Sequence, residues 1–247
     1  MTLHDDIRQA YERGDNDAVL RLTDEQLANR PGDDAAHEYR ARALLALGHL
    51  SEAERHAKDA VRIDSEEIRY RELLAQVLSR EGAHRDAATE YGRLARNDPQ
   101  QTSWTLAEAE ERLGAAQPAM SVDAARRAVQ LDPRNGRAQL TLSQALARTG
   151  DAAGAFRAAG AAHRLLAGAA DAREALADAR WLSDSDAAAF NDYRDLVHEL
   201  RGEDRARVLT KARRLWAQHA GWAGRLLVRF GPLFDLVFSR GWIRIRA

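Results

Sequence analysis

The residues able to carry out chemistry are scattered along this sequence and do not form a recognisable catalytic motif. The chain has eight histidines and no cysteine, which excludes a disulfide and a thiolate metal site. Glu52 and His56 are four residues apart, a spacing that places them on one face of a helix. No third metal ligand is near them in the sequence, so we expect an exposed side-chain pair there and no metal site.

Two acidic stretches also have plain structural explanations. Asp184-Ser-Asp186 has the start of a calcium-binding loop but lacks the later glycine and glutamate, which favours helix capping. Glu108, Glu110 and Glu111 are expected on a solvated helix face. The sequence contains no His-Glu-x-x-His, no Gly-x-Ser-x-Gly and no glycine-rich phosphate loop. We therefore expect no catalytic residue and no cofactor, and we interpret the protein as a non-enzyme.

Charge is nearly balanced over the whole chain but not along it. The formal net charge is −1, yet residues 201–247 contain 11 Lys and Arg against 3 Asp and Glu. Such a basic segment can have an interaction role of its own. No stretch is apolar enough to span a membrane, and the N-terminus lacks the features of a secretory signal. The expected location is the cytoplasm, with a membrane-peripheral location left open by the basic tail.

The elements that must position these residues follow from an internal repeat of 34 residues. Gly48 aligns with Gly82, and Ala53 aligns with Ala87. A period of this length indicates stacked supersecondary elements, each of which buries its core only against its neighbours. The predicted repeats span about 1–33, 34–67, 68–101, 102–135 and 136–169, with a degenerate repeat at 170–203.

Each repeat is expected to contain two helices. In the second repeat, the first helix is predicted over about Ala35–Leu47 and ends at Gly48, whose backbone can adopt the conformation that stops a helix. Ser51 and Glu54 have the spacing of a capping box and are predicted to start the second helix. Three positions of the repeats hold small residues, with Leu94 as the exception, and should let paired helices approach closely. They are Ala41, Ala53 and Ala60; Ala75, Ala87 and Leu94; Ala109, Ser121 and Ala128; and Ser143, Ala155 and Ala162.

These features together resemble the tetratricopeptide repeat (TPR) family. The glycine near the turn between the two helices is present at 14, 48, 82 and 150, and Ala116 replaces it once. Two repeats close on Asp-Pro, at 98–99 and 132–133. The resemblance is specific over about residues 34–165 and weaker at 1–33 and 170–203. It implies an all-α fold in which residues 1–203 form a right-handed α-solenoid of stacked antiparallel helix pairs.

In the TPR family, the first helices of successive repeats line a concave groove in which a peptide or a partner helix binds. The resemblance therefore implies a scaffold or adaptor for protein–protein interaction. Arg42, Arg69 and Glu72 are the preferred contact residues, because neighbouring repeats could hold them as an ion-paired platform for a polar peptide. The residues that the resemblance places in the groove are Glu38, Arg42, Arg69, Glu72, Gln76, Leu106, Glu110, Arg137 and Gln144.

The C-terminal part departs from the repeat. Residues 204–220 are predicted to form a helix that caps the array, followed by an irregular aromatic and basic tail at 221–247 in which 242–246 alternates like a short strand. Three alternatives are open for the tail: it completes the core of the array, it buries against a second copy as a homodimer, or it docks on an anionic membrane. Nucleic acid is the least favoured partner, because no known motif supports it. The tail residues expected to make contact under the last two alternatives are Trp222, Arg225, Arg229, Phe230, Phe234, Phe238 and Trp242.

Overall fold

The structure is a computed structural model that describes residues 2–220, 227–241, 243 and 245. These residues form helices joined by turns and contain no strand. The strand expected at 242–246 is absent at Ile243 and Ile245, and its other residues lie outside the described part. The chain divides into two compact units, here called the N-terminal unit (Met1–Gln117) and the C-terminal unit (Pro118–Ala247).

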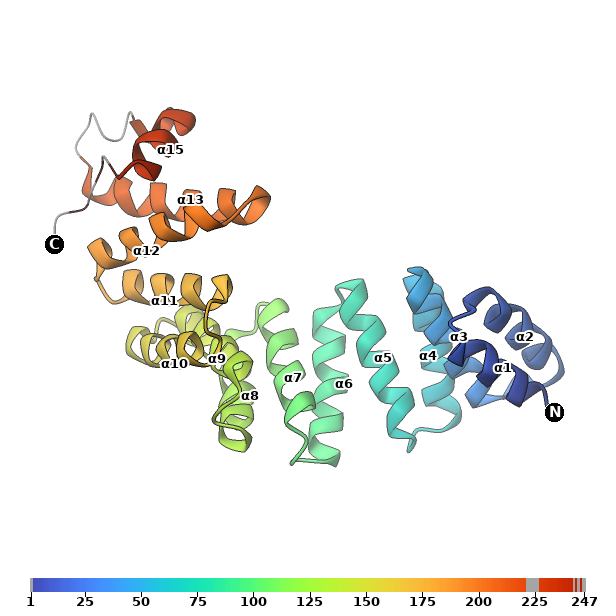
Figure 1. The fold of residues 1–247 in the computed structure, drawn as a ribbon. Helices are drawn as coiled ribbons and strands as arrows, with labels where there is room; N and C mark the ends of the chain where they lie inside the picture. Colours follow the sequence, from blue (N-terminus) through green and yellow to red (C-terminus); the bar gives the residue numbers. More distant parts are fainter. Residues whose placement is uncertain (1, 221–226, 242, 244, 246–247) are drawn as a thin grey trace. The chain divides into compact units, whose positions relative to one another are not determined.

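The N-terminal unit is a row of helices in which each helix packs against the next one in the chain (Figure 1). The first helices of neighbouring repeats also contact each other, α1 with α3 and α3 with α5. This pairing of consecutive helices confirms the predicted α-solenoid. The helices are α1 (Leu3–Glu12), α2 (Asn16–Asn29), α3 (Asp34–Leu47), α4 (Leu50–Ile63), α5 (Ile68–Glu81), α6 (His84–Asn97) and α7 (Thr102–Gly114).

The C-terminal unit is also a succession of packed helices. The pairs α9 with α10 and α11 with α12 belong to the fifth and sixth repeats, and α9 also contacts α11. The repeat pattern therefore extends through the degenerate segment at 170–203. The helices are α8 (Pro118–Leu131), α9 (Gly136–Thr149), α10 (Ala152–Leu165), α11 (Ala170–Leu182), α12 (Asp186–Glu199), α13 (Gly202–His219) and α15 (Gly231–Ser239).

The turn between the two helices of a repeat has the same backbone conformation in every repeat. One residue there has a positive φ, and its occurrences are 34 residues apart. Glycine adopts this conformation without a steric penalty, whereas a Cβ atom makes it unfavourable. Alanine and aspartate nevertheless occupy it in the fourth and sixth repeats. The φ angles are 72° at Gly14, 80° at Gly48, 82° at Gly82, 56° at Ala116, 84° at Gly150 and 55° at Asp184.

The predicted capping box at the start of α4 is wrong. The helix begins at Leu50, directly after His49, and its N-cap makes no side-chain hydrogen bond. The Ser51 hydroxyl instead donates to Glu81 Oε1 at 3.3 Å, and Glu54 pairs with Lys58 at 2.6 Å. The left-handed residue Gly48 turns the chain so tightly that the second helix starts before the predicted cap is reached.

The small residues expected between paired helices are buried, as predicted. None of the twelve residues at these three positions is more than 1% exposed. Ser143 shows how close the helices come, because its hydroxyl on α9 donates to the Ala155 carbonyl of α10 at 3.1 Å. Larger side chains at these positions would force the helices apart.

The end of the C-terminal unit has a core of its own. Phe234 and Phe238 of α15 are fully buried with Phe190 and Tyr193 of α12 and with Leu215 of α13. The Phe190 and Phe238 rings meet edge to face, with centroids 4.8 Å apart. These contacts favour the alternative in which the tail completes the core of the array, at least for its described residues.

Candidate functional site

One position of the repeat places acidic side chains on the first helices. Glu38 of α3, Glu72 of α5 and Glu174 of α11 are separated by multiples of 34 residues, and Leu106 and Leu140 hold the same position in α7 and α9. Glu38 and Glu174 are 4% and 7% exposed. A carboxylate buried to that extent must be paired or hydrogen-bonded to remain charged. The cations around these glutamates therefore define the site.

In the N-terminal unit, Glu38 lies between two of the predicted groove arginines. Arg42 Nε donates to Glu38 Oε1 at 3.0 Å from the next turn of α3. Arg69 Nε, from the following first helix α5, lies 3.6 Å from Glu38 Oε2. The Arg69 guanidinium also lies over the Tyr70 ring, 5.0 Å from its centroid, and the Tyr70 hydroxyl donates to Asp34. The structure thus brings Glu38, Arg42 and Arg69 together.

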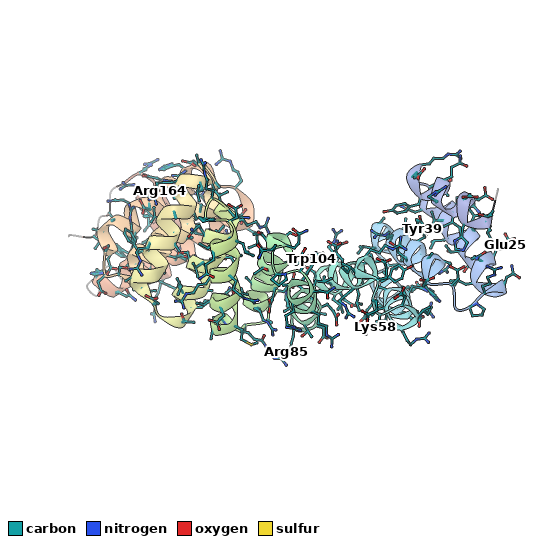
Figure 2. All side chains as sticks on the ribbon, turned by 90° about the horizontal axis from the view of Figure 1, so that it is seen from below. Glu25, Tyr39, Lys58, Arg85, Trp104 and Arg164 are labelled. Carbon is teal, nitrogen blue, oxygen red and sulfur yellow. The ribbon has the colours of Figure 1, made fainter. Side chains whose placement is uncertain are left out.

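Glu72 has an aromatic partner and, among the residues that the structure describes, no arginine partner. The indole Nε1 of Trp104, which is labelled in Figure 2, donates to Glu72 Oε1 at 3.2 Å from α7 to α5. Gln76, Leu106 and Glu110 are each half-buried on the same two helices. The predicted platform of Arg42, Arg69 and Glu72 is therefore divided between two clusters, one centred on Glu38 and the other on Glu72.

In the C-terminal unit, Glu174 is held by two cations of α13. Arg207 makes a two-pronged contact with the carboxylate, at 3.1 Å from Nε and 2.9 Å from Nη2. Lys211 Nζ lies 2.8 Å from Glu174 Oε1 and also donates to Asp178. Burial alone would raise the pKa of Glu174, but the hydrogen bonds from Arg207 and Lys211 outweigh it and hold the pKa below its usual value. We call Glu174, Asp178, Arg207 and Lys211 the Glu174 cluster.

The Glu174 cluster forms one side of a cavity of about 490 Å³ in the C-terminal unit. Its walls come from α9 and α11, the first helices of the fifth and sixth repeats, and from α13, which follows them. The cavity therefore lies on the side of the unit that these helices line. The predicted groove residue Gln144 lines it, whereas Arg137 is exposed at the start of α9 and is not a lining residue. The lining residues are Ser143, Gln144, Ala147, Arg148, Asp171, Glu174, Ala175, Asp178, Arg207 and Lys211.

The Glu174 cluster is not among the predicted site residues, although the sequence contains a signal for it. The groove prediction stopped at the fifth repeat, because the sixth is degenerate. Extending the 34-residue spacing from Glu38 and Glu72 leads to Glu174. Arg207 and Lys211 lie in the segment predicted to cap the array, and their side chains reach back to the preceding first helix α11.

Two predictions about acidic residues are wrong. Glu108 is buried at 7% exposure, and Glu111 accepts hydrogen bonds from the Ser79 hydroxyl and from His84, so these residues do not form a solvated face. The N-cap of α12 is Ser185, which makes no side-chain hydrogen bond, and neither Asp184 nor Asp186 caps this helix within the described part of the chain. Asp186 pairs instead with His219 of α13. The partners of Glu111 and Asp186 come from other helices and not from the neighbouring sequence.

His56 is buried and does not form the expected exposed pair with Glu52. Its Nε2 accepts from Arg40 Nε at 3.1 Å, and its Nδ1 lies 2.8 Å from His37 Nδ1. The His37 Nε2 in turn lies 3.1 Å from the Pro31 carbonyl oxygen. One set of tautomers satisfies all three contacts: His56 donates from Nδ1 to His37, and His37 donates from Nε2 to Pro31. Both imidazoles are then neutral.

His37, His56 and Asp59 are also close enough to hold a metal ion, since one ligand atom of each lies within 4.8 Å of the others. A metal bound to both Nδ1 atoms would require His56 to carry its proton on Nε2. That proton would face the N–H of Arg40. The hydrogen-bond chain therefore accounts for the arrangement better than a metal ion does.

The tail residues expected to form a contact surface differ in their exposure to solvent. Phe234 and Phe238 are fully buried, so in this structure they are not available to a lipid or a second copy, contrary to that expectation. Arg229 is exposed, and Phe230 is 64% exposed. Trp222, Arg225 and Trp242 lie outside the described residues. Among the described helices, none combines the length and apolar character needed to cross a membrane.

Comparisons with known proteins identify the fold. Neither protein-family models nor curated protein sequences gave a match. Among solved structures, a tetratricopeptide repeat protein from Parabacteroides merdae has a TM-score of 0.69 at 13% identity and covers 96% of each chain. YrrB, described as a TPR protein with an unusual peptide-binding site, has a TM-score of 0.61 at 16% identity and covers 76% of this chain and 97% of its own.

A third similar structure, MamA from Desulfovibrio magneticus RS-1, has a TM-score of 0.59 at 17% identity and covers 66% of this chain and 91% of its own. The similar structures and the 34-residue repeat together show that the chain has the tetratricopeptide repeat fold.

Proposed function

We propose that this protein is a non-enzymatic scaffold that binds a peptide or a partner helix along the side lined by its first helices. The observation that supports this proposal most directly is the cavity of about 490 Å³ walled by α9, α11 and α13. Two of its cations, Arg207 and Lys211, are held in place by Glu174, so their side chains need little further ordering when a ligand binds. The peptide-binding site described for YrrB, a protein with a similar fold, supports the same kind of ligand.

Selection of peptides from a random displayed library tests this proposal. The full-length chain is immobilised, the selected peptides are synthesised, and their affinities are measured for Arg207→Gln and for Gln144→Ala. Arg164→Gln is the matched control, because Arg164 is exposed on the second helix α10. We expect the two groove variants to bind about tenfold more weakly, a change of about 1.4 kcal/mol, and the control to bind normally. Peptides that lose affinity only for Arg164→Gln would contradict the proposal.

A second candidate function, docking on an anionic membrane through the tail, is favoured by one observation. Phe230, Leu233 and Leu236 are 64%, 49% and 44% exposed, and Arg229 is beside them in the chain. Exposed apolar side chains with adjacent arginines suit the headgroup region of a membrane. Flotation with vesicles of anionic or neutral lipid tests this function. The unchanged chain is compared with a variant in which Phe230, Leu233 and Leu236 are all replaced by serine. Phe234 and Phe238 remain in place, so the core is preserved.

Anionic vesicles should float the unchanged chain but not the triple variant. Equal flotation of both proteins would reject these residues as the membrane contact. A change in sedimentation without vesicles would point instead to a homodimer formed through the same residues. The cytoplasmic location expected from the sequence stays a prediction.

A further inference from the structure

A second cavity, of about 480 Å³, adjoins the first in the C-terminal unit, and Ala147 and Asp178 line both. Its charged lining differs from that of its neighbour. The first cavity is lined by three cations and three carboxylates, whereas the second is lined by three carboxylates and no lysine or arginine. We call the second one the acidic cavity. Its lining residues are Ala147, Asp178, Trp181, Leu182, Asp184, Asp186 and Gln218.

An aromatic ring forms part of the acidic cavity's wall and is held in a fixed orientation. The Trp181 indole Nε1 donates to Gln218 Oε1 of α13 at 3.3 Å. The same ring meets the Tyr193 ring edge to face, at 6.4 Å between centroids and 87° between planes. Leu182 adds an apolar side chain that is 39% exposed. A cation with an apolar stem would find both an aromatic face and an apolar contact here.

The carboxylates of the acidic cavity differ in how far their oxygens are already paired. Asp178 accepts from the Tyr193 hydroxyl with one oxygen and from Lys211 with the other. Asp186 uses Oδ2 to pair with His219, but its Oδ1 is shielded from solvent and has no hydrogen-bond partner among the described residues. A buried carboxylate oxygen without a donor is unfavourable.

We propose that the acidic cavity binds an arginine side chain of an extended peptide that lies in the groove. The inference rests on the proposed function and adds the chemistry of one contact residue. A guanidinium offers several N–H donors in one plane, suits carboxylates and stacks on aromatic rings. The carboxylates of Asp184 and Asp186 with the ring of Trp181 match these three properties. An acidic peptide residue at this place would meet the carboxylates of Asp184 and Asp186 and be repelled.

A pair of blocked peptides tests the inference with the full-length chain. The first is acetyl-Gly-Ser-Arg-Leu-Ser-Gly-amide, and the second has citrulline, a neutral group of the same shape, in place of arginine. Binding is followed by nuclear magnetic resonance at the Trp181 indole N–H. We expect the arginine peptide to bind about tenfold more tightly than the citrulline peptide, and added salt to reduce the difference.

Variants of the cavity sharpen the test. Asp184→Asn and Asp186→Asn should each reduce the preference for arginine, and asparagine at 184 suits the positive φ found there. Asp123→Asn is the matched control, because Asp123 is exposed on the second helix α8 and lines neither cavity. Circular dichroism checks that each variant folds.

Equal affinities of the two peptides would overturn the inference, and so would an arginine preference that both variants retain. A shift at Trp181 caused by calcium chloride, with none caused by the arginine peptide, would also overturn it in favour of a metal-ion site. These failures are distinguishable from failure of the proposed function. Peptides selected from the library would in that case still depend on Arg207 and Gln144.

Discussion

Glu38 and Glu174 occupy the same position of the repeat, in the N-terminal and C-terminal units respectively, but their charges are neutralised differently. Glu38 has Arg42 on its own helix at 3.0 Å and a looser contact with Arg69 at 3.6 Å. In the C-terminal unit, the position of Arg42 is taken by Asp178, and both cations near Glu174 come from the next first helix, α13. Glu174 therefore links two helices, whereas Glu38 is paired mainly within one helix.

This difference shows that the repeat determines where a buried carboxylate lies, but not which helices that carboxylate holds together. A carboxylate paired within its own helix stabilises chiefly that helix. One paired with the next first helix stabilises the stacking of the repeats and shapes the groove between them. In the C-terminal unit the second arrangement coincides with the two cavities.

The largest expected effect separates the two units by their response to acid. Burial, followed by the charges of Arg40, His37 and Arg55, lowers the pKa of His56 from 6.5 to about 4. His56 therefore binds a proton at a higher pH in the unfolded chain than in the folded one. The free energy of unfolding of the N-terminal unit should fall by about 3 kcal/mol as the pH falls from about 6.5 to 4. The pKa of Glu174 is lowered from 4.5, so its contribution to the C-terminal unit is lost only below that pH.

Hydrogen exchange measured helix by helix between pH 7 and pH 4 checks this order. Protection should fall in α3 and α4 before it falls in α11 and α13. His56→Gln should remove most of the early loss, and His198→Gln is the control, because His198 is exposed on α12. Simultaneous loss of protection in both units would show that the histidine pair does not govern the acid response.

Removing each glutamate gives the next largest effect. Glu174→Ala leaves Arg207 and Lys211 without their shared partner, and we expect a loss of about 2 kcal/mol, reduced from the full cost of breaking a buried pair because Arg207 is half-exposed. Glu38→Ala should cost about 1 kcal/mol, since the Arg69 contact is longer and Arg69 is also half-exposed. Urea unfolding measures both changes.

Glu199→Ala is the control for the same experiment. Glu199 pairs with Arg173 at the surface, so its removal should change stability by less than about 0.5 kcal/mol. A larger loss for Glu38→Ala than for Glu174→Ala would refute the contrast drawn between the two units.

The smallest effects are expected at the turns, where each unit contains one residue other than glycine. Ala116→Gly should stabilise the protein by about 1 kcal/mol, because it removes the Cβ penalty at φ 56°. Asp184→Gly should gain less, about 0.5 kcal/mol, since aspartate tolerates this conformation better than alanine does. Thermal unfolding measures both, with Gly82→Ala as the converse change. A destabilising Ala116→Gly substitution would mean that helix propensity outweighs the turn.

The sequence predicted the array because the residues that define it act locally and recur. Gly48 and Gly82 end helices through their own backbone, and Ala53 and Ala87 are small wherever paired helices meet. The partners of the charged residues could not be predicted in this way. His56 is paired with a residue 19 positions away, where local spacing had suggested Glu52. Glu174 is paired with a residue 33 positions away, and no local spacing indicated that partner.

The tail shows the same limit. Its aromatic residues left open whether the tail completes the core or forms a contact surface. The sequence could not show that Phe234 and Phe238 turn inward while Phe230 remains exposed. That outcome depends on which side of α15 meets Phe190 and Leu215, and those two residues belong to earlier helices.

The central claim is that a ligand binds along the first helices. Hydrogen exchange of the full-length chain, with and without a library-selected peptide, tests it most directly. Bound peptide should slow exchange in α9, α11 and α13, which wall the cavity, and leave α8, α10 and α12 unchanged. Protection confined to α8, α10 and α12 would contradict the account.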